Sequence, residues 1–195
     1  MRQMRLFIAV NLPVEIKRSL GSFIQVLRRF PLDARWVTEA NLHLTLQFLG
    51  NVSEERVPAI VQGLNRAAAG VAPFKLVISG VGVFPSVERP RVFWVGVSGD
   101  TTALAGLHRR VREEMGLLGF EAERRRFSPH LTLARIRSPR GFRTLLDKAE
   151  EYAGKTKKFG NTRIVSMELM LSELSSKGAK YYVLASIPLS GLPVV

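Results

Sequence analysis

The chain has 195 residues, 46% of them hydrophobic and 23% charged, which is typical of a globular protein with a sizeable core. Its 29 Lys and Arg residues against 16 Asp and Glu give a formal net charge of +13, which favours polyanionic partners, nucleic acid first among them. The absence of cysteine excludes disulfides, thiolate nucleophiles and cysteine-based zinc sites. The apolar stretch 6–10 is too short for a signal peptide and no run is long enough to span a bilayer, so we expect a cytoplasmic protein without a membrane partner.

In the first half of the chain, strand-like and helix-like segments alternate. Pro13 opens a segment whose apolar residues follow helical spacing, and Gly50-Asn51 predicts a turn. The predicted elements are, in order, a strand at 6–10, a helix at 14–30, a strand at 42–49, a helix at 53–69, and strands at 74–83 and 92–97.

The second half repeats this alternation. Its predicted elements are a helix at 101–118, a basic segment at 121–126, a strand at 130–136, a helix at 142–152, and closing strands at 163–171 and 181–187. Two similar halves indicate an α+β fold with two sheets or lobes. Since no linker rich in Gly, Ser or Pro separates the halves, we expect one domain over residues 1–195.

One tetrapeptide occurs twice, as His43-Leu44-Thr45-Leu46 and as His130-Leu131-Thr132-Leu133. Strict alternation in a strand places His43, Thr45 and Gln47 on one face, and the leucines with Phe48 on the other, in the core. A single copy would be an ordinary half-buried strand. The exact repetition uses two of only three histidines in the chain and therefore favours a functional site.

The chemistry of these side chains suits phosphate. An ordinary histidine pKa of about 6.5 lets one imidazole take a proton while a second donates one near neutral pH. Threonine hydroxyls can hydrogen-bond the non-bridging oxygens of a phosphate and stabilise the charge that develops there. Two such platforms facing one another would surround one phosphorus atom.

The paired His-x-Thr-x motifs resemble the signature of the two-histidine (2H) phosphoesterase superfamily, and the chain is most similar to the bacterial and archaeal RNA 2′,3′-cyclic phosphodiesterases, also called 2′-5′ RNA ligases. The likeness covers nearly the whole chain. The residues that carry it are Arg5-Leu6-Phe7-Ile8-Ala9-Val10, His43-Leu44-Thr45-Leu46-Gln47-Phe48-Leu49-Gly50, Ser128-Pro129-His130-Leu131-Thr132-Leu133-Ala134-Arg135, Ser172-Glu173, Gly178 and Tyr181.

This resemblance implies a bilobal fold of two pseudo-symmetric, mainly antiparallel sheets with helices outside and a central cleft. It also implies hydrolysis of 2′,3′-cyclic phosphate ends to 2′-phosphates, a weak reverse ligation that forms 2′-5′ links, and a role in RNA processing. The expected partner is RNA with a cyclic phosphate terminus, tRNA fragments included, and the expected state is a monomer without a cofactor.

Within the site we expect His43 to be the proton donor and His130 the proton acceptor, with Thr45 and Thr132 on the phosphate. Arg126 and Arg135 flank His130 in sequence, and their positive charge favours a neutral imidazole, the form a base requires. The resemblance gives His43 the same donor role.

The two flanking arginines are also candidates for substrate binding. Arg135 looks like the family arginine that contacts phosphate, although strict alternation would place it on the leucine face, so a surface position stays open. Arg126 ends the run Arg124-Arg125-Arg126, which could follow an RNA backbone or be a solvated loop.

Other functions compete with this interpretation. A zinc site would need an Asp or Glu as third ligand, and neither motif contains one, so no metal is predicted. A non-catalytic RNA-binding module would not require two matched histidines. A phosphodiesterase for another cyclic phosphate or for 2′-5′ oligonucleotides stays open, because the motifs specify phosphate chemistry and not the attached base.

Overall fold

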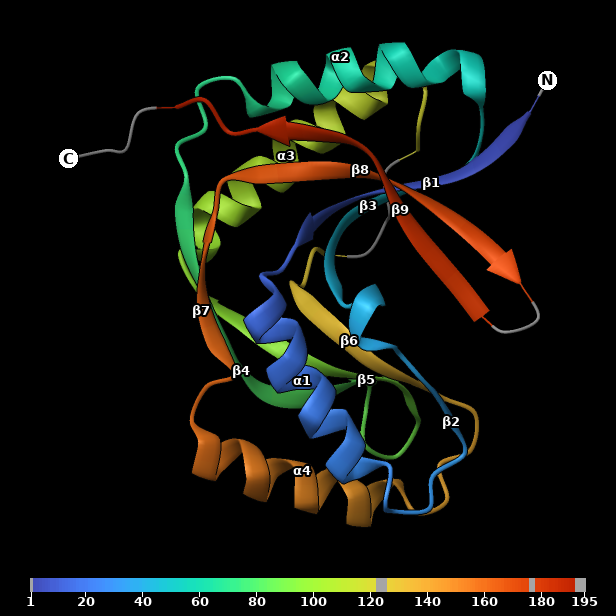
Figure 1. Ribbon diagram of the computed structural model, residues 1–195, viewed down its shortest axis with the longest axis vertical. Coiled ribbons are helices and arrows are strands. Elements are labelled where there is room, and N and C mark those ends of the chain that lie inside the picture. Colours follow the sequence, from blue (N-terminus) through green and yellow to red (C-terminus); the bar gives the residue numbers. More distant parts are fainter. Residues whose placement is uncertain (1, 122–125, 176–177, 192–195) are drawn as a thin grey trace.

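The computed structural model describes residues 2–121, 126–175 and 178–191 (Figure 1). Its strands form two sheets in which every pairing is antiparallel. Sheet A consists of β3 (His43–Ser53), β1 (Gln3–Asn11), β8 (Ser166–Ser175) and β9 (Gly178–Pro188), in that order. Sheet B consists of β2 (Ala34–Trp36), β6 (His130–Ile136), β5 (Pro90–Gly99), β4 (Phe74–Pro85) and β7 (Gly160–Ile164).

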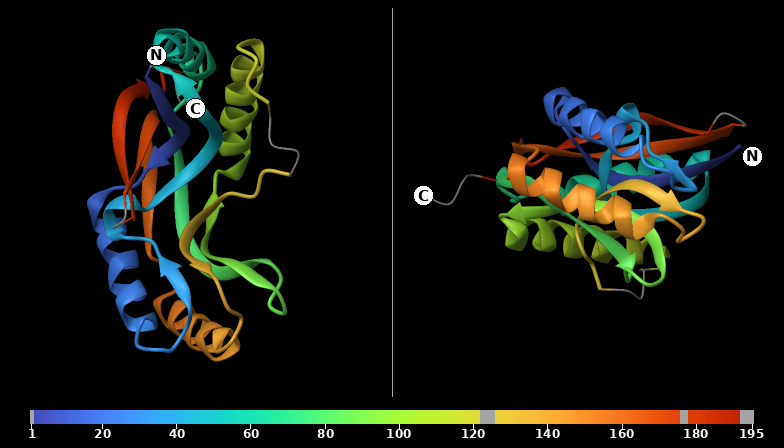
Figure 2. Two further views of the ribbon diagram at one scale, coloured as in Figure 1. Left: turned by 90° about the vertical axis from the view of Figure 1, so that its right-hand side faces the viewer. Right: turned by 90° about the horizontal axis from the view of Figure 1, so that it is seen from below.

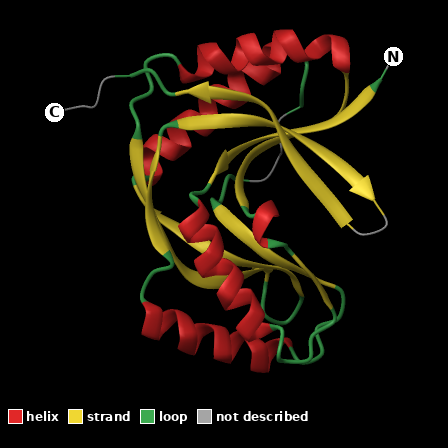
Figure 3. Cartoon of the chain, in the orientation of Figure 1, coloured by secondary structure: helices red, strands yellow, loops and turns green. Residues whose placement is uncertain are grey.

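In the described part of the chain, four α-helices cover the sheets in two pairs, which lie at opposite ends of the molecule (Figures 2 and 3). The helices are α1 (Val14–Leu27), α2 (Val57–Ala68), α3 (Thr101–Leu117) and α4 (Phe142–Thr156), with short 3-10 turns η1 (Glu39–Asn41) and η2 (Glu54–Arg56). Helix α2 packs on sheet A, α1 and α4 pack on sheet B, and α3 contacts both β3 of sheet A and β4 of sheet B. Each buries one apolar stripe, as the helical spacing in the sequence predicts.

The hydrophobic core is continuous between the two sheets. One cluster of buried residues contains Leu6 and Ile8 of sheet A together with Phe93 and Leu131 of sheet B. In each sheet the strand that begins with a motif histidine pairs with a long apolar strand, β3 with β1 and β6 with β5. The predicted α+β architecture of two antiparallel sheets is therefore confirmed.

Three details of the sequence-based assignment are wrong. The predicted strand 163–171 is two strands in different sheets, because the chain passes from sheet B to sheet A at the exposed Val165. The predicted turn at Gly50-Asn51 lies inside β3, where Gly50, with φ of 74°, pairs with Leu6 next to a register shift. Strand β2 is absent from the assignment because its three residues are too few to show a period.

One extra residue interrupts both histidine strands at the same place. In β3 the partners of Ile8 and Ala9 are Gln47 and Thr45, so Leu46 has no partner. In β6 the partners of Phe93 and Trp94 are Ala134 and Thr132, so Leu133 has no partner. Each β-bulge shifts the alternation by one residue beyond this point.

The bulges overturn three expectations based on strict alternation. Gln47, expected beside His43 and Thr45, is buried opposite Ile8. Phe48, expected in the core, is 47% exposed and its ring contacts that of Phe7. Arg135 is exposed on the face of His130 and Thr132, not on the leucine face.

Each sheet therefore has one face that carries a motif histidine. The histidine face of sheet A bears Phe7, Ala9, His43, Thr45 and Phe48. The histidine face of sheet B bears Val92, Trp94, His130, Thr132 and Arg135.

We predict that Gln47→Met stabilises the protein. The side-chain Oε1 and Nε2 atoms of Gln47 are buried and find no hydrogen-bond partner within the described part of the chain. Replacing such an amide by an apolar side chain of similar size removes its desolvation cost, so the free energy of unfolding should rise by about 1–3 kcal/mol in urea denaturation. Gln25→Met on the exposed face of α1 is the control and should change little. A loss of stability in Gln47→Met would contradict the prediction.

Candidate active site

The two motifs come together where sheet A meets sheet B. His43 and His130 are the first residues of β3 and β6, two strands that contact one another although they belong to different sheets. Burial and, to a smaller extent, the positive charges of Arg135 and His130 across this contact lower the pKa of His43. The structure thus assembles His43 and Thr45 from one sheet with His130, Thr132 and Arg135 from the other.

Both imidazoles are held in the same way. Nδ1 of His43 lies 2.6 Å from the carbonyl oxygen of Asn41, and Nδ1 of His130 lies 2.7 Å from that of Ser128. A carbonyl only accepts hydrogen bonds, so each Nδ1 carries the proton and donates it. Each Nε2 is therefore the atom that exchanges protons with a ligand. Nothing in the sequence indicates this bond, because its acceptor is a backbone atom two residues earlier.

Aromatic rings flank each histidine. The ring of His43 lies 4.9 Å from that of Phe7 and 5.2 Å from that of Tyr181, measured between centroids. The ring of His130 lies 5.0 Å from Phe84, and Trp94 lies 5.0 Å from Phe84 in turn. These contacts restrict the orientation of both imidazoles.

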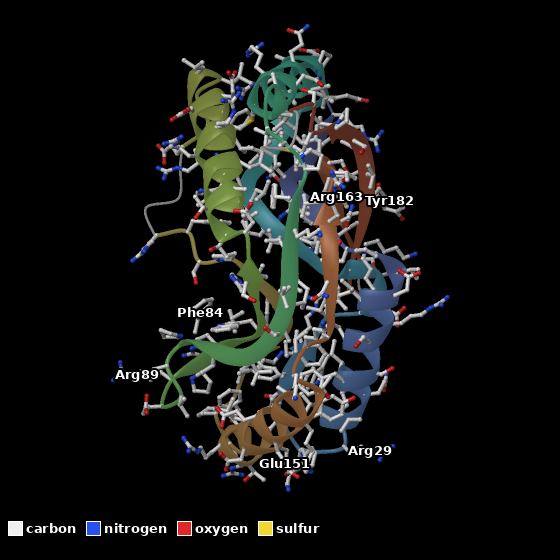
Figure 4. All side chains as sticks on the ribbon, turned by 90° about the vertical axis from the view of Figure 1, so that its left-hand side faces the viewer. Arg29, Phe84, Arg89, Glu151, Arg163 and Tyr182 are labelled. Carbon is white, nitrogen blue, oxygen red and sulfur yellow. The ribbon has the colours of Figure 1, made fainter. Side chains whose placement is uncertain are left out.

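The position of Trp94 depends on a glycine in the neighbouring strand β4, the strand that also carries Phe84. Phe84 lies on the inner side of the curved β4–β5 hairpin (Figure 4). The ring of Trp94 covers Gly82, where any Cβ atom would overlap it. No sequence signal indicates this support, since Gly80-Val81-Gly82 resembles an ordinary glycine-containing strand end.

His43 is electrostatically unlike an ordinary histidine. Burial, the largest effect, and the positive charges of Lys17 and Arg135 lower its pKa to about 4, against the opposing hydrogen bond to Asn41. Its Nε2 lies 3.0 Å from Oγ1 of Thr45, and in the neutral ring it accepts this hydrogen bond. The sequence led us to expect an effect of Arg135 on His130; in the structure its positive charge contributes to the lowered pKa of His43.

The turn η1 that carries Asn41 is fixed from three directions. Nζ of Lys17 donates to the carbonyl of Ala40, and Nδ2 of Asn41 donates to the carbonyl of Ala179 in β9 at 2.7 Å. The carboxylate of Glu39 lies against Gly21 of α1, where a Cβ atom would come within 2.5 Å of its Oε2. Sequence reasoning does not find Lys17, because it lies on a helix far from both motifs.

The remaining predicted binding residues have simple positions. Arg135 is exposed on the histidine face of sheet B, and Arg126 is exposed just before β6. Arg124 and Arg125 lie outside the described residues. Among the residues that are described, no group of three or more His, Asp or Glu side chains could hold a metal ion.

A family model for LigT-like phosphoesterases matches the chain twice, over residues 10–94 and 95–181. The chain belongs to the LigT-like phosphoesterase family. Each match contains one His-x-Thr-x motif, so the two halves of the chain that carry the repeated tetrapeptide are each similar to the family model.

Curated relatives share the name RNA 2′,3′-cyclic phosphodiesterase. The protein of Thermotoga maritima is 38% identical over 134 residues, which are 69% of this chain and 71% of the relative. That of Methanothermobacter thermautotrophicus is 32% identical over 181 residues, 92% of this chain and 95% of the relative.

Solved structures of the family share the whole fold. A crystal structure of a protein from Thermus thermophilus has a TM-score of 0.77 at 30% identity and covers 96% of this chain and 99% of its own. The crystal structure of E. coli LigT complexed with 3′-AMP has a TM-score of 0.74 at 25% identity, covering 97% and 99%. In the described residues of our chain, no helix is long and apolar enough to cross a membrane.

We predict that His43 titrates near pH 4 in the free protein, as read from the pH dependence of its imidazole NMR signals. Because this pKa lies below that of an unfolded histidine, the stability that His43 contributes is complete above about pH 6.5 and is lost as the pH falls toward 4. Lys17→Met removes a positive charge and should move the midpoint upward, whereas Arg18→Met on the same helix should not. A midpoint near 6.5 in the unaltered protein would show that the site is hydrated and contradict the prediction.

Proposed function

We propose that this protein hydrolyses the 2′,3′-cyclic phosphate ends of RNA to 2′-phosphates, without a metal ion. The observation that carries the proposal is the matched pair of His-x-Thr units, each with its Nδ1 bonded to a backbone carbonyl, at the contact of β3 and β6. The names of the relatives and the net charge of +13 support RNA as the substrate. The proposal includes tRNA fragments among these RNAs.

In the proposed reaction, Nε2 of His130 takes a proton from water and the water oxygen attacks phosphorus. The bond from phosphorus to the 3′ oxygen breaks, and Nε2 of His43 gives this oxygen its proton, which leaves a 2′-phosphate and a 3′ hydroxyl. The hydroxyls of Thr45 and Thr132 donate to the non-bridging oxygens, and Arg135 stabilises their negative charge. With the 5′ hydroxyl of a second RNA in place of water, the same groups would form a 2′-5′ link.

The low pKa of His43 places a condition on this assignment. At neutral pH His43 is unprotonated in the free protein, so a proton donor at this position must gain its proton as substrate binds. The cyclic phosphate carries a negative charge, and its entry would offset the charges of Lys17 and Arg135 and raise the pKa of His43. The substrate would thereby cause the protonation of His43 that the reaction requires.

The proposed enzyme acts as a monomer, and Arg126 would contact the RNA backbone outside the reacting centre.

We expect His43→Ala and His130→Ala each to lower the hydrolysis of a cyclic-phosphate oligonucleotide by about 10²–10⁴-fold, since each removes one proton-transfer group. The assay uses EDTA-treated protein and identifies the product by mass and by its sensitivity to phosphatase. His108→Ala in α3 is the control and should retain activity. Full activity in the double mutant His43→Ala/His130→Ala, or its loss from the unaltered protein on metal removal, would refute the mechanism.

A substrate with an activated leaving group separates the roles of the two histidines. Such a substrate needs no proton donor, so it should rescue His43→Ala far better than His130→Ala. The comparison is made on kcat/KM across the full pH profile, because the proton-transfer activity of His43 depends on its protonation state. Preferential rescue of His130→Ala would exchange the two roles.

A further inference from the structure

A second arginine stands beside Arg135 at the edge of sheet B. In the pairing of β2 with β6, Arg35 is the direct partner of Arg135. Directly paired residues of antiparallel strands project to the same face, so Arg35 shares the histidine face with Arg135. Both side chains are exposed. Since β2 is the edge strand of sheet B, Arg35 lies at the solvent edge of the histidine face, next to Arg135.

The side chain of Arg35 extends toward the other sheet. Nη2 of Arg35 would lie 3.0 Å from a Cβ atom at Gly178, the first residue of β9 in sheet A. Gly178 has a φ of 125°, a conformation that favours glycine, and the missing side chain leaves room for the guanidinium. Arg35 thus bridges the space between β2 and the start of β9, on the side where Asn41 is also tied to β9.

Neither arginine has a carboxylate partner among the described residues, although one is available nearby. Asp33, two residues before Arg35, forms its ion pair with Arg137 instead, at 3.7 Å. Like charges placed directly opposite in a sheet are unfavourable. Arg135 and Arg35 are therefore two guanidinium groups without a carboxylate partner on the face that carries His130 and Thr132. Such a pair fits a ligand with more than one negative charge.

We propose that Arg35 binds the phosphodiester on the 5′ side of the terminal nucleotide, so that the site recognises at least two nucleotides of RNA backbone. The inference rests on the proposed function, in which the terminal cyclic phosphate lies between the histidines and next to Arg135. Next to Arg135, on the edge strand β2, lies Arg35, and beyond it is solvent. An RNA chain that leaves the site over this edge brings its next phosphate toward the 5′ end to Arg35. A phosphate contact reads no base, so the preference is for backbone and not for sequence.

The test compares a mononucleoside 2′,3′-cyclic phosphate, which has no second phosphate, with a dinucleotide that ends in the same group. Arg35→Gln should lower kcat/KM for the dinucleotide about tenfold, the usual effect of losing one hydrogen-bonded ion pair, and leave the mononucleoside unchanged. Arg35→Lys keeps the charge and should retain part of the dinucleotide preference. Arg163→Gln is the matched control, because Arg163 is an exposed arginine on β7, the opposite edge strand of the same sheet (Figure 4).

An uncharged methylphosphonate in place of the internal linkage provides the second arm. The unaltered protein should lose about the same tenfold on this analogue, and Arg35→Gln should lose nothing further. An equal effect of Arg35→Gln on the dinucleotide and the mononucleoside, or no effect on either, would overturn the subsite while leaving the proposed function intact. An unaltered protein that hydrolyses neither cyclic phosphate would overturn the proposed function and this inference together.

Discussion

One bulge at the same position of both histidine strands, at Leu46 in β3 and at Leu133 in β6, determines which side chains the site contains. Without the bulge at Leu133, Arg135 would point into the leucine core, where an unpaired guanidinium costs several kcal/mol. With it, two buried residues, Leu133 and Ala134, follow one another, and Arg135 emerges beside Thr132. The bulge at Leu46 does the same in the other sheet and presents Phe48. The local geometry is shared, and the residue that it exposes is what differs.

The proposed mechanism assigns opposite proton transfers to two motifs that share this local structure. Both imidazoles donate from Nδ1 to a carbonyl two residues earlier, so their tautomers match. Their surroundings do not match, because His43 lies under Phe7 and Tyr181, close to Lys17, while His130 contacts Phe84. Asymmetry is therefore added from helices and neighbouring strands, and not within the motifs themselves.

The limits of prediction from sequence follow from the same features. The alternation of polar and leucine residues is local and strong, so the faces of His43, Thr45, His130 and Thr132 could be predicted. A bulge depends on how a strand pairs with its neighbour, which the local sequence does not specify. Strict alternation therefore places Gln47, Phe48 and Arg135 on the wrong faces. The change of sheet at Val165 and the pairing of the three-residue β2 depend on tertiary contacts as well. Only the pairing of β2 with β6 places Arg35 beside Arg135.

The ion pairs show where the excess positive charge of the protein is left unneutralised. On the outer helices, cationic side chains pair with acids, as Arg66 does with Glu114 and Arg143 with Asp147. Exposed pairs of this kind add little stability, but they neutralise the surface on which they lie. At the histidine faces, Arg35 and Arg135 have no such partner among the described residues. In the proposed mechanism, this unbalanced charge attracts a polyanion toward the two histidines. Strand β6 would then serve both purposes, because it carries Arg135 as well as His130.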